Sequence, residues 1–295
     1  DSNGLNYQGD DDSFDVEYGT DGQSLHIVYS DATNGWIPTI DEAVAEVPVK
    51  ANDNGLFGFG YGAADSGVTN VVSNTGVVAT DTSAVGTART KIAACEFGGD
   101  KGIFGFGSVG GSKLATTNLV SNTGVVATDT AGAGGVTAQH QLAACSYGGD
   151  KGIFGFGGDP ITGVTNLVSN AGVVASDVSA VGTARRNPAG CEFGTDKGIF
   201  AYGVETWPNF TAVSNIVSNT GVVASDVSGV GTARPSSAGC KYGEDKGIFG
   251  FGYLYQNMTN LVSNTGVIGT DVTGVGTARY SLGATQYGKD KGIFG

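Results

Sequence analysis

The sequence predicts an all-β repeat protein, and three observations favour a β-propeller of four-stranded blades. First, 52 glycines in 295 residues are far above the usual share and follow no three-residue period, which excludes collagen and leaves an ordered, turn-rich fold. Second, the same phrases recur every 45 to 50 residues, which is the length of one propeller blade. Third, no repeat keeps a 3.6-residue apolar period, so helices are not expected in the repeats.

The repeat consists of four phrases, each of which predicts a strand or a turn. The phrase G-[IL]-F-[GA]-[FY]-G is followed by N-[LVI]-V-S-N-[TA]-G-V, then by V-G-T-A-R, and then by A-[AG]-C-x-[FY]-G. The first phrase begins at Gly55, Gly102, Gly152, Gly198 and Gly247, and a truncated copy occupies residues 292–295.

Four short strands, a to d, are expected in each unit. Strand a covers Ile92–Phe97 and strand b covers Gly102–Gly107, and the Gly-Gly-Asp-Lys between them is typical of a hairpin turn because Gly and Asp tolerate positive φ. Strand c covers Asn70–Ser73 and strand d covers Gly76–Thr80, with a short Asn-Thr turn between them. Each blade is therefore expected to be a sheet of four antiparallel strands.

Strand b explains the abundance of glycine. Successive side chains of a strand point to opposite faces, so Phe104 and Phe106 are expected on one face and Gly105 on the other. The aromatic face of one blade can then lie on the glycine face of the next.

Three regions follow from the repeat boundaries. Residues 1–24 form an acidic N-terminal segment, residues 25–54 a divergent β-hairpin and linker, and residues 55–295 the repeat β-propeller. The propeller units start at 55, 102, 152, 198 and 247, with a closing strand at 292–295.

The blade number has two interpretations. Six blades are favoured if Leu25–Ser30 and Trp36–Pro38 supply the outer hairpin of a sixth blade and Val47–Ala51 the first strand a. In the alternative, five blades carry residues 1–54 as an N-terminal appendage.

The charge is concentrated at the N-terminus. Residues 1–54 hold twelve acidic residues and one lysine, whereas the remaining residues hold sixteen acidic and fourteen basic ones. A nucleic-acid-binding surface needs a basic stripe, so nucleic acid is not an expected partner. No apolar run approaches the roughly 18 residues of a membrane helix, so membrane insertion is not expected either.

Part of the repeat resembles the kelch repeat of β-propellers. The resemblance lies in Arg89, Phe97-Gly98, Gly102–Gly107 and Asn118–Val125: an arginine, a glycine turn, an aromatic strand ending in glycine, and a hairpin with Thr-Gly. This resemblance implies the propeller architecture.

Nearly the whole chain is similar to repetitive proteins of marine bacteriophages, of the tail-fibre or virion type. The shared sequence motifs are those at Asp150–Gly157, Asn118–Val126 and Val85–Arg89, and the N-terminal segment of these proteins is similar to Ser13–Ile37. The similarity implies a virion or extracellular location, with a host cell-surface glycan or protein and other virion subunits as partners.

No residue pattern indicates catalysis, so the chain is expected not to be an enzyme. His26 lies in no metal-ligand spacing, and His140 fills a position taken elsewhere by Thr, Arg, Pro and Tyr, so surface histidines are expected. Asp-Lys pairs recur at every a–b turn, which indicates a structural role. Acidic residues outside these repeated positions are few, with Asp65, Asp159 and Glu205 as examples.

The cysteines and the N-terminal acidic residues are the residues considered as candidate metal ligands. Cys95, Cys145, Cys191 and Cys240 fill one repeat position and lack any C-x-x-C pairing, so free, buried thiols are expected. No cofactor is expected except for a weak calcium candidate at Asp10, Asp11, Asp12 and Asp15, since hard cations prefer several oxygen ligands.

The b–c connections are where the repeats differ most. Their lengths are nine, ten, eight, eleven and seven residues, whereas the a–b and c–d turns are nearly uniform. Up-and-down strands would put all b–c loops on one face, and binding residues concentrate on loops held by a rigid scaffold. The aromatic residues of this face are the candidate ligand-binding residues: Tyr61, Trp207, Phe210, Tyr253 and Tyr255.

These observations lead to a non-enzymatic binding or adhesion module of a phage tail fibre or other virion component. The variable b–c loop face would recognise a cell-surface glycan or protein, because exposed aromatic rings beside polar groups suit both. The alternative is a purely structural fibre or capsid decoration subunit.

Overall fold

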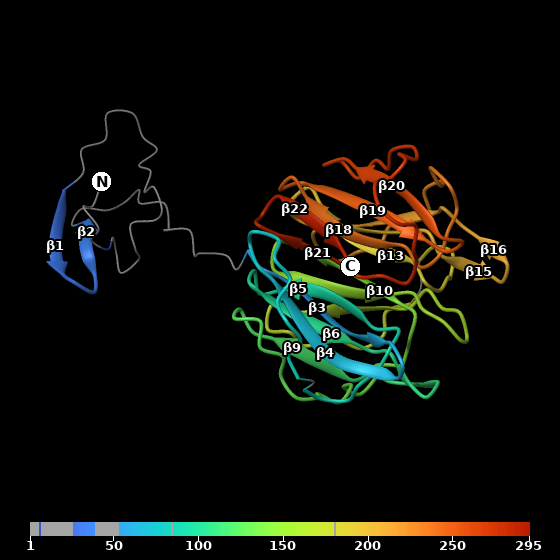
Figure 1. Cartoon of the computed structure of the whole chain (residues 1–295), viewed down its shortest axis with the longest axis horizontal. Coiled ribbons are helices and arrows are strands. Elements are labelled where there is room, and N and C mark those ends of the chain that lie inside the picture. The colour runs from blue at the N-terminus through green and yellow to red at the C-terminus, as the bar shows by residue number, and fades with distance from the viewer. Residues whose placement is uncertain (1–5, 7–25, 39–52, 84, 180) are drawn as a thin grey trace. The chain divides into compact units, whose positions relative to one another are not determined.

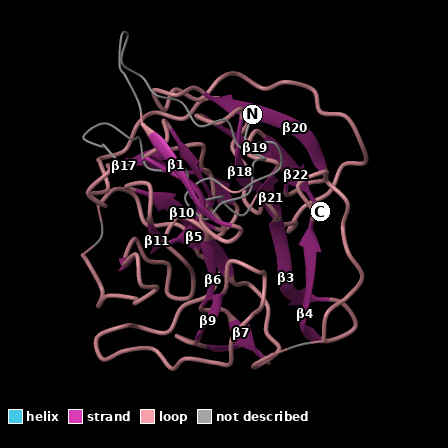
Figure 2. Cartoon of the chain, turned by 90° about the vertical axis from the view of Figure 1, so that its left-hand side faces the viewer, coloured by secondary structure: helices cyan, strands magenta, loops and turns pink. Residues whose placement is uncertain are grey.

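The chain folds into two units that are described separately, Asp1–Ala51 and Asn52–Gly295. The computed structural model describes residues 6, 26–38, 53–83, 85–179 and 181–295. Figure 2 shows strands and loops in the described part of the chain, which includes no helix long and apolar enough to cross a membrane. The expected first strand a at Val47–Ala51 lies outside the described residues.

The described part of the first unit is a β-hairpin made of β1 (Ile27–Asp31) and β2 (Gly35–Pro38). Two backbone N–H groups of the turn, with the Asn34 side chain, donate to the Asp31 carboxylate and lower its pKa to about 2. The expected hairpin is confirmed. The two strands pair with each other, and Trp36 of β2 donates to the Asn6 carbonyl of the same unit. Their place as the outer hairpin of a sixth blade stays a prediction.

Six small antiparallel sheets contain the repeated strands of the second unit in its described residues (Figure 1). The first contains β3 (Gly55–Tyr61) and β4 (Asp65–Val72), and the last contains β21 (Ala284–Tyr287) and β22 (Lys291–Phe294). The four between them have three strands each: β5 (Ala93–Phe97), β6 (Lys101–Gly105) and β9 (Thr117–Val120); β10 (Ala143–Tyr147), β11 (Lys151–Gly155) and β12 (Thr165–Val168); β13 (Ala189–Phe193), β14 (Lys197–Ala201) and β17 (Ser214–Val217); β18 (Ala238–Tyr242), β19 (Lys246–Gly252) and β20 (Gln256–Val262).

Two b–c loops carry an additional small hairpin. The hairpins are β7 (Ser108–Val109) with β8 (Ser112–Lys113), and β15 (Val204–Thr206) with β16 (Asn209–Phe210). The predicted strands a, b and c therefore correspond to real strands, and the order in each three-stranded sheet is a-b-c.

The predicted strand d is not a regular strand in the described residues. Val120 of strand c pairs with Val126, and the next pairing joins Thr117 to Thr130, so segment d holds one extra residue. Such a bulge interrupts the ladder. The side chain of Asn118 fills the gap by donating to a carbonyl and a carboxylate of segment d, at 3.0 and 2.9 Å. The expectation of four regular strands is therefore wrong.

Phenylalanine packs on glycine between consecutive sheets, as predicted. A Cβ atom added to Gly105 would lie 2.6 Å from the ring of Phe154 in the next sheet. Equivalent contacts join Phe104 to Gly58, Phe200 to Gly155 and Phe294 to Gly250. A further contact of this kind joins the last sheet to the first, since a Cβ atom at Gly295 would lie 3.1 Å from the Phe57 ring.

The two phenylalanines of strand b do not share a face. Phe106 directly follows the last residue of β6 and has a φ of 63°, in the left-handed region. This conformation breaks the alternation of side chains. Phe104 contacts Phe59 in the preceding sheet, with ring centroids 5.1 Å apart, whereas Phe106 contacts Phe154 in the following sheet at the same distance. The expectation that both rings lie on one side is wrong.

A second set of contacts uses the cysteines, whose sulfur atoms lie where only glycine leaves room. The pairs are Cys95 with Gly152, Cys145 with Gly198, Cys191 with Gly247, Cys240 with Gly292, and Thr285 in the same role with Gly55. All four thiols are free, three of them are buried, and burial raises the pKa of Cys95 and Cys240 to about 12. The expectation of unbridged thiols that pack as small apolar groups is confirmed.

Backbone hydrogen bonds connect the a–b turn of one sheet to the next sheet. Gly98, Gly148, Gly194 and Gly243 donate to the carbonyls of Asp150, Asp196, Asp245 and Asp290, each at 2.7 Å. In the last sheet, Gly288 donates to Asp53, which directly precedes the first sheet, at 2.7 Å. Strand β21 also contacts β3. The contacts thus run from sheet to sheet and return from the last to the first.

Three arginines of V-G-T-A-R, Arg89, Arg185 and Arg234, are buried, whereas Arg279 is exposed. Arg89 donates to the Phe106 carbonyl at 2.8 Å and to Asn118 Oδ1 at 2.6 Å, and its guanidinium lies 4.3 Å from the Phe59 ring centre. It also forms an ion pair of 3.9 Å with Asp129. Each such arginine therefore connects its own sheet to the preceding one.

Candidate functional site

The two ends of the sheets differ in chemistry, as the sequence predicts. We call the end with the a–b and c–d turns the turn face; Asn264 of a c–d turn donates there to Asp245 of an a–b turn at 2.9 Å. We call the end with the b–c loops the variable face. The residue after V-G-T-A-R also lies there, since Thr90 pairs with Ser108 and Arg186 with Val204 at the start of the b–c loops.

Four of the five predicted aromatic residues come together on the variable face. Trp207 and Phe210 lie on the β15–β16 hairpin, and Tyr253 and Tyr255 lie in the tight loop between β19 and β20. The Trp207 ring centroid is 5.5 Å from that of Phe210 and 5.3 Å from that of Tyr253, with edge-to-face geometry. Such packing holds the rings in fixed orientations.

A fifth ring, Tyr280, completes this aromatic cluster and escaped sequence reasoning. Its centroid lies 5.6 Å from that of Tyr253 and 5.1 Å from that of Tyr255, so it links the two tyrosines of the loop. Trp207 is 54 % exposed and Tyr255 is 66 % exposed. The aromatic cluster, Trp207, Phe210, Tyr253, Tyr255 and Tyr280, is therefore both ordered by mutual contact and open to solvent.

Tyr61, the remaining predicted residue, is exposed at the end of β3. Its ring has no aromatic partner in the described residues, so the structure does not bring it into the aromatic cluster.

Tyr280 belongs to a set of residues brought together by the backbone. The residues that follow Tyr280 and its equivalents are joined by a continuous chain of backbone hydrogen bonds. In this chain each N–H donates to the next carbonyl, from Ser281 to Ser236, Asn187, Gln141 and Lys91. The residues that precede them are Tyr280, Pro235, Arg186, His140 and Thr90. This position, which sequence reasoning treats as tolerant of any residue, thus follows the variable face from sheet to sheet.

His140 is buried, which corrects the expectation of a surface histidine. Only 7 % of it is exposed, and neither ring nitrogen has a hydrogen-bond partner in the described residues. Burial lowers the pKa of His140, and the positive charges of Lys91, Lys113 and Arg186 act in the same direction. The backbone carbonyl of His140 accepts from Gly158 at 2.9 Å, which fixes the histidine under the b–c loop of its sheet.

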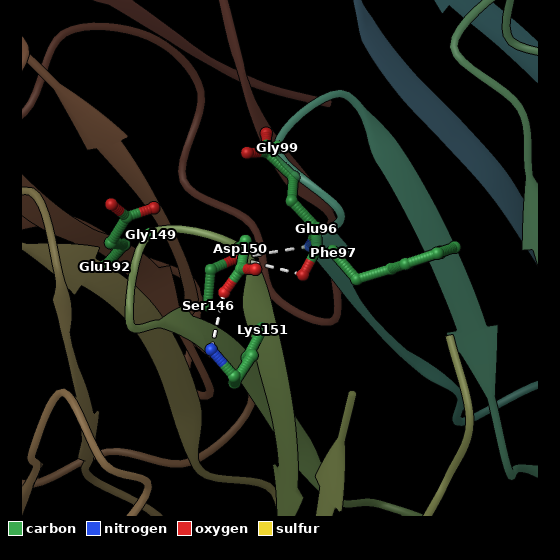
Figure 3. A pocket seen from close by; sticks show the side chains of 8 residues that line it. All are labelled: Glu96, Phe97, Gly99, Ser146, Gly149, Asp150, Lys151 and Glu192. Carbon is green, nitrogen blue, oxygen red and sulfur yellow. Dashed lines mark hydrogen bonds and ion pairs between the residues drawn. The ribbon is translucent and has the colours of Figure 1, made fainter. Parts of the chain in front are cut away.

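A polar cluster lies on the first strands of the sheets, which contact one another in series. It fills position x of the phrase A-[AG]-C-x-[FY]-G with Glu96, Ser146, Glu192, Lys241 and Gln286. Figure 3 shows Glu96, Ser146 and Glu192 around a small pocket that Asp150 and Lys151 also line. The sequence signal was present, because this one position varies among constant neighbours, but sequence reasoning overlooked it when counting acidic residues outside the repeats.

The polar cluster is held by direct contacts across the sheets. Lys241 Nζ forms an ion pair of 2.9 Å with Glu192, and Gln286 Nε2 donates to Glu96 Oε1 at 2.7 Å. Glu96 is exposed, but desolvation by its neighbours, with the charge of Glu192, raises its pKa to about 7, while Gln286 and Lys241 act in the opposite direction. Glu192 thus has a lysine as its direct partner, whereas the direct partner of Glu96 is an amide.

The repeated Asp-Lys pairs are surface ion pairs between neighbours in sequence. Their Nζ–Oδ1 distances range from 2.5 to 3.1 Å in five copies. The structural role predicted for them fits this regular geometry. Exposed pairs of this kind contribute little to stability.

Metal binding finds no support in the described residues. They contain no group of three or more His, Cys, Asp or Glu side chains placed to hold a metal ion. The calcium candidate of Asp10, Asp11, Asp12 and Asp15 lies outside the described residues.

The chain matches no known family model, and no curated protein matches it in sequence. The case for its function therefore depends on the fold and on the chemistry of the two faces.

Proposed function

We propose that the repeats of the second unit, Asn52–Gly295, form a six-bladed β-propeller. The support is the set of contacts that return from the last sheet to the first: Phe57 on Gly295, Thr285 on Gly55, and Gly288 hydrogen-bonded to Asp53. Each repeats, across the ends of the unit, a contact that other neighbouring sheets make. An open row of sheets would leave these groups at opposite ends.

We further propose that this propeller is a non-enzymatic adhesion module that binds a cell-surface glycan through the variable face, as part of a phage tail fibre or other virion component. The observation that carries the proposal is the aromatic cluster, which exposes Trp207 and Tyr255 on loops that differ among repeats. Ordered aromatic rings bind the flat faces of sugars at a low cost in side-chain entropy.

Glycan binding is tested with a triple substitution in the aromatic cluster, Trp207→Ala, Tyr253→Ala and Tyr255→Ala. Binding of the variant and of the parent chain is measured on a glycan array and on host cells. We expect the variant to lose most of the binding, because central aromatic residues dominate interface energetics.

The matched control removes exposed apolar groups from c–d turns. Val173, Val222 and Val267 are each 63 to 65 % exposed and are replaced together by Ala. This control should bind like the parent chain. Equal binding by the aromatic variant and the parent would remove the basis for a ligand-binding variable face.

A second candidate function, a structural fibre or capsid subunit, is favoured by these same valines. Every complete c–d turn exposes one, at Val77, Val125, Val173, Val222 and Val267. A regular set of exposed apolar groups suits contact with sister subunits. Under this alternative, Val→Asp substitutions at these positions would abolish assembly into particles, which sedimentation and immunogold labelling measure, and no glycan would bind.

A further inference from the structure

The variable face carries a cationic cluster beside the aromatic cluster. Its members are Lys91, Lys113, His140 and Arg186. Of the charged groups that act on the His140 ring, three are these cations and one, Asp159, is an acid. Asp159 meets Lys113 through its backbone, since Lys113 Nζ donates to the Asp159 carbonyl at 2.7 Å.

These cations differ from most others in the repeats because no acid neutralises them. Elsewhere in the described residues five lysines of the a–b turns pair with the preceding Asp, Lys241 pairs with Glu192, and Arg89 and Arg234 are buried against Asp. Lys91 and Arg186 form no side-chain hydrogen bond or ion pair within the described residues, and Lys113 binds only a carbonyl. Three cations without an acidic partner thus lie close together in a protein of net charge −13.

The buried His140 is a second, independent observation that points to a ligand. Its two ring nitrogens are buried and unpartnered, as is Gln139 Oε1 next to it. A buried polar group without a hydrogen bond is costly, and such groups are rare in proteins. A polar ligand that reaches the ring beside three cations would satisfy it, and the surrounding charge selects an anion.

The cationic cluster continues into the aromatic cluster. Arg186 pairs with Val204 at the start of β15, the strand that leads to Trp207. Arg186 also lies near Gly158, since a Cβ atom added to this glycine would lie 3.1 Å from the Arg186 side chain. The N–H group of Gly158 donates to the backbone carbonyl of His140. Arg186 therefore lies between Trp207 and His140 along the variable face.

We propose that the variable face binds an acidic glycan, with the aromatic cluster stacking on sugar rings and the cationic cluster receiving a carboxylate or sulfate group. This inference rests on the proposed glycan binding and adds the class of glycan. The guanidinium of Arg186 suits a two-pronged contact with either anion, and Lys91 and Lys113 supply further charge.

The first experiment tests the anion site without any sugar. The chain is labelled at histidine, its two imidazole signals are assigned with a His26→Gln variant, and inorganic sulfate or glucuronate is titrated while NMR follows His140 and His26. We expect saturable shifts at His140 alone. The Lys91→Gln, Arg186→Gln double variant should abolish the saturation, whereas a control with equal loss of charge on the turn face, Lys289→Gln with Lys291→Gln, should retain it.

The second experiment compares oligogalacturonate with its methyl ester, which removes the charge and keeps the ring, beside an array of neutral, carboxylated and sulfated glycans. We expect the parent chain to prefer acidic over neutral partners by about tenfold or more, as one charge-assisted contact allows. The double variant should bind both kinds equally.

The outcomes separate this inference from the function on which it rests. Neutral glycans bound as well as acidic ones, with an unchanged double variant, would overturn the acidic class and leave glycan binding intact. No binding to any glycan would overturn the proposed function, and the NMR titration alone would then decide whether the anion site exists. A His140 that responds to sulfate no more than His26 does would overturn the anion site.

Discussion

The turn face and the variable face are built from the same repeat and differ in how they treat charge and conformation. On the turn face, each Asp-Lys pair neutralises itself within 3.1 Å, and glycines at positive φ form the turns. On the variable face, cations lack acidic partners and aromatic rings are exposed. A repeated position that is identical in all sheets maintains the scaffold, whereas a position that differs in each is available for binding.

The largest expected effect tests whether the buried arginines belong to the scaffold. Arg234 donates to the Phe251 carbonyl and to Asn260, and Arg234→Met would leave both buried acceptors unpartnered. The free energy of unfolding should fall by about 3–5 kcal/mol, measured by urea denaturation. Arg279→Met is the matched control: this arginine is exposed and its side chain makes a single hydrogen bond, so a loss as large as that of Arg234→Met would contradict the assignment.

The next effect concerns the contact between sheets. Gly105→Val would force a side chain against the Phe154 ring and should cost about 1–3 kcal/mol of stability. Gly134→Val is the control, because nothing lies within 4 Å of a Cβ atom there. Equal thermal stability of the two variants would show that the glycine face is not a packing surface.

A smaller effect depends on pH and involves the polar cluster. The folded state raises the pKa of Glu96 from 4.5 to about 7, so its charged form is disfavoured in the folded protein. The contribution of Glu96 to the free energy of unfolding is therefore fully present below pH 4.5 and is lost as the pH rises through 7. Glu96→Gln should reduce this loss between pH 5 and pH 8, whereas Glu244→Gln on an exposed turn should not. Parallel stability profiles of parent and Glu96→Gln would refute the raised pKa.

The smallest effect is expected on the turn face itself. Lys197→Gln removes one exposed ion pair with Asp196, and the free energy of unfolding should change by about 0.5 kcal/mol or less. A loss of several kcal/mol in chemical denaturation would mean that these pairs hold the sheets together.

Local patterns made much of the fold predictable. Strands a and b and their turns follow from short phrases bounded by glycine, and the packing of phenylalanine on glycine follows from their alternation. The left-handed φ of Phe106 could not be foreseen, because phenylalanine has no preference for it. The bulge in segment d could not be predicted for a similar reason, because it depends on an Asn side chain that donates a hydrogen bond across strands.

The candidate site was predictable only in part. Loop length pointed to Trp207 and Tyr253, but Tyr280 joins them from a different part of its repeat. His140 was expected on the surface and Glu96 was overlooked, because a single residue that varies within a constant motif gives no sign of its role until the sheets bring it beside its neighbours.

Closure of the repeats into a ring is the claim on which both faces depend, and one engineered disulfide tests it. In a ring, Gly55→Cys and Thr285→Cys should form a disulfide, because the Thr285 Oγ1 atom lies 2.9 Å from where the Cβ atom of residue 55 would be. Gly198→Cys opposite the native Cys145 provides the same geometry between consecutive sheets as a control. Peptide mapping by mass spectrometry should find both links. A 145–198 link without a 55–285 link would mean that the sheets form an open row.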